Sequence, residues 1–433
     1  MIPTHPYHKS GIFHALICIF FLLRASVVAQ PALNISGRVT DAGKDFPLLF
    51  AQIVLSNSTT GTVTNEEGQF FLSIPADRIH DSIVISYLGY EPARMAVSGM
   101  TGQTTLVRLK PREFNLKEVE VLALTPEEVM RRMFNRISEN YGRDSVLLTA
   151  FYRSRKYTGQ KLAEYAEAII EDLKTGYFTQ NTMKDVQYLG AHSNLTHLIK
   201  GRVVSDTNLV NSMGDAGKMA GCLGCTFRED IIECNFRTMF DEEDFRFYTY
   251  TMEELSNPEG GKIYHIRFDQ ANNKIKGRKG EMFIDGNSFA LMTIRLKPSY
   301  LGFEKFTKDK IKRTYTIQNV PGWIVDMPLF DQTMIYSKRN NSWYLSTIHD
   351  EQWITFTLPS TGRKIRMGYK NDLVVTDVSR DPEKLHNFKG DAKAGIKLRW
   401  DQLVGQADEA FWANFNYLPV EESLKKAIGE IKK

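Results

Sequence analysis

Residues 33–110 contain short runs of alternating hydrophobic and polar residues, separated by clusters of Asp, Asn, Gly and Pro. The runs are Leu33–Val39, Phe50–Leu55, the two arms of Gly61–Ile74, Asp81–Tyr87 and Thr105–Leu109. Alternation with a period of two is typical of β-strands that bury one face. Six or seven such strands in so short a segment predict a β-sandwich, which we assign to residues 30–110.

The stretch Gly61–Phe70 predicts a β-hairpin within this domain. Thr62 and Thr64 alternate into a polar turn, and the alternation resumes at Phe70. Asn65 at the start of the turn and Gly68 at its end suit a type I turn that is closed by a residue with positive φ. These residues predict architecture, and none of them indicates catalysis.

The motifs at these strands and at the turns between them resemble those of the carboxypeptidase-regulatory-like domain. The matching motifs are Gly37-x-Val39-x-Asp41, Pro47-Leu48, Ala51-x-Ile53, Gly61-Thr-x-Thr64, Gly68-x-Phe70 and Ser86-Tyr-x-Gly-Tyr90. The resemblance implies a transthyretin-like, seven-stranded sandwich of Greek-key type, with no catalytic or metal-binding residues of its own. It also implies an exported protein of the kind found in the Bacteroidota envelope, where this domain is commonly fused to other modules.

A linker strand and a helix are predicted to follow the sandwich. Residues 111–124 include the alternating run Glu113–Val121, which resembles the strand that often trails this domain. Thr125-Pro-Glu-Glu128 then predicts a helix start, because Thr caps, Pro suits the first helical position and Glu128 completes a capping box. An apolar stripe through Val129 and Met133 predicts that one face of this helix is buried.

Residues 125–433 are predicted to form a second domain of one helix, a large antiparallel sheet and a C-terminal helix. The strand-like runs are Leu147–Tyr157, Leu162–Leu173, Phe245–Met252, Lys262–Phe268, the hairpin Glu281–Ile294, Thr314–Gln318, Gln332–Lys338, Trp343–Ile348, Trp353–Leu358 and Asn371–Val378. Residues 174–230 are interpreted as an irregular excursion, and Glu421–Ile431 as a short helix after an aromatic tail. The fold class is therefore mainly β, with a curved, half-barrel-like sheet. In outline it resembles periplasmic lipoprotein carriers.

The first 29 residues are interpreted as a secretory signal. A weakly basic start at Lys9 precedes the apolar run Ala15–Leu23, and small residues lead to a cleavage site between Ala29 and Gln30. An uncleaved anchor is the alternative. No later run is long and apolar enough to cross a bilayer as a helix. We therefore expect an exported protein, either periplasmic or associated with the outer membrane, with secretion or surface display as the alternative.

Charge argues against nucleic acid as a partner. The formal net charge is +4, and it falls to +2 when Lys9 and Arg24 leave with the signal. A balance this small gives no electrostatic basis for binding a polyanion.

Three cysteines remain after the predicted cleavage, namely Cys222, Cys225 and Cys234. In an oxidising compartment we expect one disulfide among them and one spare thiol. Three free thiols, or a redox or metal site at Cys222-Leu-Gly-Cys225, are the alternatives.

The sequence contains no recognised catalytic signature. It has no His-Glu-x-x-His helix, no Gly-x-Ser-x-Gly elbow and no Walker loop, so no catalytic, cofactor-binding or metal-binding residue is predicted. His265 is interpreted as a hydrogen-bonded sheet histidine. His349-Asp350-Glu351 is interpreted as a solvated turn, with acid–base chemistry as the alternative. His192 and His197 could chelate a metal with the cysteines only if the fold brought them together.

Besides a structural or surface-assembly role, two functions stay open at the level of sequence. The first is a non-enzymatic envelope protein, in which the sandwich mediates protein interaction and a concave aromatic groove of the sheet domain binds a partner or an apolar or glycan ligand. The second is an unrecognised hydrolase with its site in residues 145–380. Isolation of His192, His197, His265, His349 and His386 from acidic side chains would exclude the hydrolase.

Overall fold

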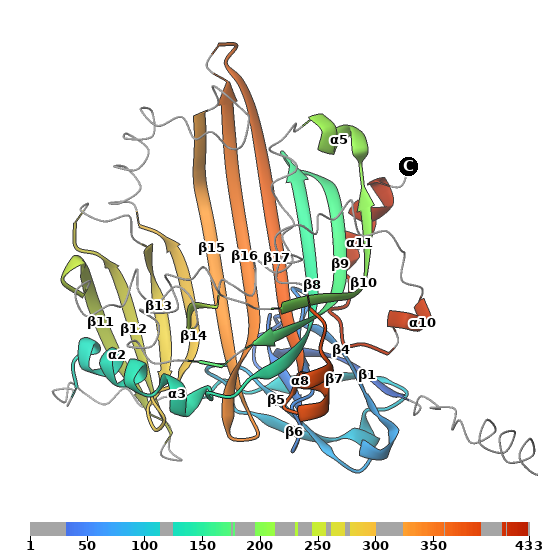
Figure 1. Cartoon of the computed structure of the whole chain (residues 1–433), viewed down its shortest axis with the longest axis vertical. Helices are drawn as coiled ribbons and strands as arrows, with labels where there is room; N and C mark the ends of the chain where they lie inside the picture. Colours follow the sequence, from blue (N-terminus) through green and yellow to red (C-terminus); the bar gives the residue numbers. More distant parts are fainter. Residues whose placement is uncertain are drawn as a thin grey trace, which may run out of the picture.

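The chain folds into an N-terminal pair of small sheets that lies beside one large open sheet (Figure 1). The computed structural model describes residues 32–112, 124–174, 176–177, 195–212, 230–232, 245–256, 261–272, 278–299, 324–358, 360–390, 409–412 and 414–431. The predicted signal with Ala29 and Gln30, nearly all of the predicted linker strand, and the run Thr314–Gln318 lie outside these residues. The same holds for Cys222, Cys225, Cys234 and His192.

The N-terminal domain contains seven strands, of which six match the predicted runs and β6 was not predicted. One sheet has the order β4 (Gln69–Pro75), β1 (Ala32–Asp41), β7 (Thr104–Leu109), and the other has the order β3 (Gly61–Val63), β2 (Gln52–Leu55), β5 (Ser82–Ser86), β6 (Ala93–Ala96). Single-turn 3-10 helices occur at η1 (Ala76–Arg78) and η2 (Val97–Gly99). Ile35, Ile53, Leu72 and Ile85 are fully buried in one shared core, so the two sheets pack face to face.

The predicted β-hairpin at Gly61–Phe70 is wrong, because β3 and β4 lie in different sheets and do not pair with each other. The turn that connects them nevertheless has the predicted geometry. Gly68 adopts a φ of 75°, and its amide donates to the Asn65 carbonyl at 2.9 Å. The Asn65 side-chain oxygen accepts the amide of Gln69 at 2.8 Å. A Cβ at position 68 would lie 2.5 Å from the Val39 carbonyl oxygen, so glycine is required here for space as well as for φ.

The predicted helix is α2 (Pro126–Asn135), and it is followed by α3 (Ile137–Asn140). The capping box is present: the Thr125 hydroxyl accepts the Glu128 amide at 3.2 Å, and the Glu128 carboxylate accepts the Thr125 amide at 2.8 Å. Val129 and Met133 are buried on the face that meets the large sheet. The prediction from the Thr-Pro-Glu-Glu motif is confirmed.

The large sheet has ten antiparallel strands and is not closed. Its order is β10 (Leu195–Ser205), β9 (Lys161–Lys174), β8 (Val146–Thr158), β17 (Arg363–Ser379), β16 (Ser342–Leu358), β15 (Ile324–Arg339), β14 (Leu291–Pro298), β13 (Arg278–Asp285), β12 (Lys262–Gln270), β11 (Tyr248–Ser256). The last strand, β17, therefore returns to pair with β8, the first. The prediction that residues 174–230 are irregular is wrong in part, because β10 and α5 (Thr207–Ser212) form within them.

Opposite faces of this sheet have different neighbours. Side chains such as Tyr152, Met334 and Ile348 point to the largest core cluster, together with α2 and α3. Alternate positions such as Phe151 and Val374 point the other way, toward the sandwich and the C-terminal segment. The remaining short elements are η6 (Phe245–Phe247), α8 (Pro382–Asn387), α10 (Glu409–Trp412) and α11 (Glu422–Ile431).

The described helices are too short or too polar to cross a lipid bilayer.

Candidate binding groove between the two domains

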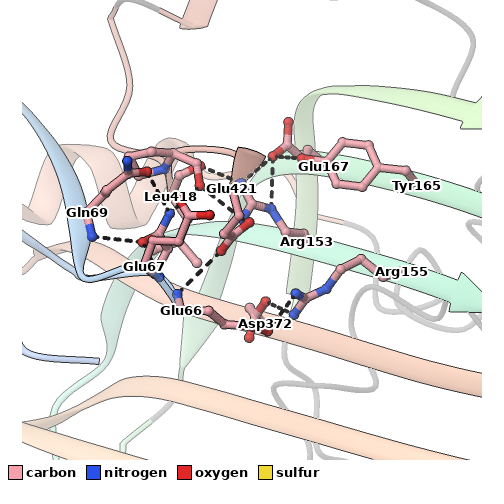
Figure 2. A network of polar contacts seen from close by, with 12 residues as sticks. Glu66, Glu67, Gln69, Arg153, Arg155, Tyr165, Glu167, Asp372, Leu418 and Glu421 are labelled. Carbon is pink, nitrogen blue, oxygen red and sulfur yellow. Dashed lines mark hydrogen bonds and ion pairs between the residues drawn. The ribbon is translucent and has the colours of Figure 1, made fainter. Parts of the chain in front are cut away.

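A buried ionic network joins β8 and β9 to the C-terminal segment (Figure 2). Arg153, on the sandwich-facing side of β8, has no exposed surface. Its guanidinium donates to the Glu167 carboxylate at 2.8 Å, to the Glu421 carboxylate at 3.3 Å and to the Leu418 carbonyl. Burial raises the pKa of Glu167, but the charges of Arg153 and Arg202 outweigh burial and lower it overall. Glu167 is therefore ionised at neutral pH, and the network is charged.

A second group of charges connects the sheet to the sandwich. Arg155 donates to Glu66 of the β3–β4 turn at 3.0 Å and to Asp372 of β17. Asp372 also accepts a hydrogen bond from Nδ1 of His349 at 2.7 Å. Burial alone would raise the pKa of Asp372, but Arg155 and His349 lower it well below its usual value. Asp372 is thus a buried anion shared between Arg155 and His349.

Three further contacts fix the position of the sandwich. The Asn65 side-chain amide donates to the Pro419 carbonyl at 3.0 Å. The hydroxyl of Thr59 donates to Asp377 at 2.9 Å. Ser346, at a bulge of β16, donates to the Gln52 side-chain carbonyl at 2.7 Å. Hydrogen bonds at several separate points restrict both sliding and rotation of the sandwich on the sheet.

A groove of about 1140 Å³ lies beside this junction. One wall comes from the sandwich and includes Val54, Val84, Ser86 and Tyr87. The other wall comes from the sandwich-facing side of the large sheet and includes Phe283, Thr293, Thr333, Ile335 and His349. The groove therefore exists only because the two domains are held together. The sequence predicted a groove within the second domain alone, whereas the structure places it between the domains.

Phe50 lines the groove beside His349, which belongs to the ionic network. Phe50 adopts a φ of 61°, a left-handed conformation that costs a bulky side chain on the order of 1–3 kcal/mol. Its ring packs 5.3 Å from the imidazole of His349, measured between ring centroids. The strained backbone thus places an aromatic wall against the one histidine among the groove-lining residues.

The groove is basic. Its lining contains the cations Arg94, Arg112, Arg295, Lys297, Lys338 and Arg339, against the carboxylates Asp331 and Glu351. Both carboxylates are already paired, Asp331 with Lys297 at 3.1 Å and Glu351 with Lys370 at 3.3 Å. The field inside the groove is therefore positive, although the net charge of the whole chain is small.

The structure corrects the interpretation of His349-Asp350-Glu351 as a solvated turn. All three lie inside β16, and the His349 side chain is only 16% exposed. The strand runs unbroken from Ser342 to Leu358 because its polar residues find partners on β17. Asp350 points to the opposite face, where it accepts hydrogen bonds from Gln352 and Asn371.

The other histidines are not brought together. His265 lies on β12, where it contacts Glu281 at 2.8 Å and stacks on Phe283, so the prediction of a hydrogen-bonded sheet histidine is confirmed. His197 lies on β10 and His386 on α8. Within the described ranges, no three His, Cys, Asp or Glu side chains are grouped as metal ligands.

Sequence reasoning missed Arg153 and Arg155. Both lie on one face of a buried strand, and Glu167 lies on the neighbouring buried strand. Charges at alternate positions inside buried strands are rarely tolerated without partners. That pattern could have predicted an ionic network, although not which distant residues complete it.

The chain is thus a two-domain, β-rich protein with a basic groove between its domains. Residues 35–121 match the model of the CarboxypepD_reg-like domain, so the N-terminal sandwich is a domain of this kind. No curated protein matches the chain.

Several solved structures show a weak likeness. A domain assigned to outer membrane lipoprotein sorting, from Vibrio parahaemolyticus, is 9% identical with a TM-score of 0.25, over 59% of this chain and 95% of that one. A LolA superfamily protein from Nitrosomonas europaea is 11% identical with a TM-score of 0.21, over 61% and 99% of the two chains. TM-scores this low do not establish a shared fold, and the resemblance to lipoprotein carriers stays a prediction.

Proposed function

We propose that this chain is an exported, non-enzymatic binding protein of the cell envelope, whose ligand occupies the groove between the two domains. The observation that carries the proposal is the groove itself, which is about 1140 Å³ in volume and combines apolar walls with basic side chains. Ligand sites are typically concave, mainly apolar and provided with a few polar groups. The export signal predicted from residues 1–29 supports the location.

The ionic network supports a binding role because it holds the groove in shape before a ligand arrives. Arg155 contacts Glu66 of the sandwich, and the same arginine contacts Asp372 of the sheet. A site that is already formed loses less conformational entropy on binding than one that must close. The sandwich thus serves as one wall of the site, in addition to any contact it makes with other proteins.

Filling the groove is expected to abolish ligand retention. Val84→Trp on β5 and Thr333→Trp on β15 place an indole in the groove from opposite walls. Both positions are half-buried, so the native strands are expected to form. Purification from the native envelope, followed by mass spectrometry of extracted small molecules, measures retention. We expect the wild-type chain to carry a ligand and both variants to carry at least about tenfold less.

Thr104→Trp is the matched control for this experiment. Thr104 is exposed on β7, in the sheet of the sandwich that does not line the groove. We expect this variant to retain the wild-type ligand. Equal retention by all three tryptophan variants would show that the groove is not the binding site.

Hydrolysis is the second candidate function, because His349 and Asp372 form a histidine–carboxylate pair that borders the groove. In catalytic triads, the carboxylate of such a pair orients the histidine, and the histidine acts as the general base. The criterion for excluding a hydrolase, isolation of the histidines from carboxylates, is therefore not met. However, no hydroxyl or thiol of the described residues is hydrogen-bonded to His349, so the pair lacks a nucleophile. This difference favours binding.

A further inference from the structure

Four of the cations that line the groove are Arg94 and Arg112 on the sandwich side and Lys338 and Arg339 at the end of β15. Across the part of the chain that the structure describes, none of the four forms an ion pair with a carboxylate. By contrast, Arg295 and Lys297 on β14 are paired with carboxylates at 2.7 Å and 3.1 Å. Positive charge without a carboxylate partner is therefore present on both walls of the groove.

Arg339 is the most unusual of these cations, since it is only 1% exposed. Its guanidinium donates to the Thr59 carbonyl at 2.7 Å and to the Val375 carbonyl at 2.9 Å. Burial lowers its pKa to about 10, so it stays charged at neutral pH. The charge of Asp377 partly offsets the effect of burial, but the direct hydrogen-bond partners of the Arg339 guanidinium are all neutral. A buried cation with neutral partners attracts an anion placed nearby.

A second, independent feature is the Gln52 side chain, which also lines the groove and is 8% exposed. Its carbonyl oxygen accepts the hydrogen bond from Ser346, but its amide nitrogen has no partner among the described residues. Leaving a buried donor unpaired costs on the order of 1–3 kcal/mol. A ligand oxygen that accepted this hydrogen bond would remove the penalty.

Apolar side chains border the same space. Phe50, Val54 and Val84 come from the sandwich, and Phe283 and Ile335 come from the sheet. The groove thus combines apolar side chains with unpaired cations and an unused hydrogen-bond donor. This combination complements a molecule with an apolar chain and a compact anionic head.

We propose that the groove binds an amphiphile with an acyl-length apolar chain and a single anionic head group, either a carboxylate or a phosphate. The head lies against Arg94 and Arg112, near the buried charge of Arg339, and the chain extends between the two domains. The inference rests on the proposed binding function and specifies its ligand. A neutral glycan or a neutral lipid does not use the four unpaired cations.

The test compares head groups on one apolar chain. Calorimetric titration of the full chain, freed of bound material, would use sodium dodecanoate, dodecyl phosphate and neutral 1-dodecanol, each below its aggregation limit. We expect the two anionic probes to bind at least about tenfold more tightly than the alcohol, with a preference that falls as salt concentration rises. Dodecanoate and dodecyl phosphate separate the two possible sources of the anion.

Charge reversal tests whether Arg94 and Arg112 bind the anionic head group. In Arg94→Glu combined with Arg112→Glu, we expect the anionic probes to lose at least about tenfold in affinity and the alcohol to be unchanged. Arg363→Glu combined with Lys364→Glu, at exposed positions at the start of β17, is the matched control and should bind all probes as wild type.

The outcomes separate this inference from the proposed function. Equal affinity for all three probes, or no effect of the Arg94 and Arg112 reversal, would overturn the anionic head group while the groove still binds. In another outcome, the wild-type chain carries a native ligand in the retention experiment and yet, once freed of it, binds none of the three probes. That result would overturn the amphiphile but not the proposed function. Retention of the native ligand by the tryptophan variants would instead overturn the proposed function itself.

Discussion

Replacing Arg153 with methionine is expected to lower the free energy of unfolding by about 3–5 kcal/mol. The guanidinium has no exposed surface, and it holds Glu167 and Glu421 together. Methionine fills similar space but leaves Glu421 without its cation and Glu167 with Arg202 alone. The measurement is urea denaturation at neutral pH. The C-terminal helix α11 is expected to detach first, because Glu421 and the Leu418 carbonyl are both contacts of Arg153.

Arg267→Met is the matched control for that loss. Arg267 forms a 2.8 Å pair with Glu253 on the same large sheet, but both side chains are about half exposed, at 50% and 46%. Its removal is expected to cost less than about 1 kcal/mol. Arg153→Lys, which keeps the charge but not the forked geometry, should fall between the two. Equal losses in Arg153→Met and Arg267→Met would contradict the structural role of the network.

Replacing Asp372 with asparagine is expected to loosen the junction between the domains and to cost about 3–5 kcal/mol. Asp372 is the shared anion for Arg155 and His349, and all three side chains are largely buried. Burial by itself lowers the pKa of His349, but the hydrogen bond and charge of Asp372 outweigh it and raise that pKa above its usual value. In the variant, the His349 pKa is therefore expected to fall below about 6.5. An NMR titration of the imidazole measures it.

The same pair predicts how stability depends on pH. The folded-state pKa of Asp372 is lowered, so its contribution is present above the unfolded value of about 3.9 and is lost as pH falls toward the folded value. The folded-state pKa of His349 is raised, so its contribution is complete below about 6.5 and is lost as pH rises through the folded value. Both contributions are thus present between about pH 4 and pH 6.5.

In the wild type, urea midpoints should decline as pH rises from about 6.5 through the folded-state pKa of His349, and should level off above it. In Asp372→Asn that decline should disappear. An unchanged His349 pKa in the variant would show that Asp372 is not the partner that sets it.

Features encoded by neighbouring residues were predictable from the sequence. Thr125 and Glu128 lie three positions apart, so their capping box depends only on the local chain. The same reasoning applies to Asn65 and Gly68, whose turn requires a left-handed residue. Six of the seven strands in the two small sheets were predicted from alternation, because the residues of each strand alternate between a buried and an exposed face. The seventh strand, β6, was missed.

Features that depend on distant residues were not predictable. The partner of Arg153 in the C-terminal segment, Glu421, lies 268 positions away. The polar stretch at His349 resembles a turn when it is considered alone, and it is a strand because β17 supplies Asp372 beside it. The groove has one wall in each domain, so no single segment of sequence contains it.

The network and the groove form one functional unit in this account. Glu66 belongs to the β3–β4 turn, and its contact with Arg155 holds the sandwich against the sheet. His349 belongs to the network through Asp372 and to the groove through its exposed edge. Loosening the junction should therefore weaken ligand binding as well as stability.

Site-specific photo-cross-linking in the native envelope tests the central claim most directly. A photoreactive amino acid at Thr333 lies in the groove, and one at Thr104 lies on the sandwich surface away from it. After irradiation, mass spectrometry of the purified chain is predicted to show an added small molecule at position 333 and none at position 104. Absence of any adduct at position 333, or the same adducts at both positions, would contradict a ligand site between the two domains.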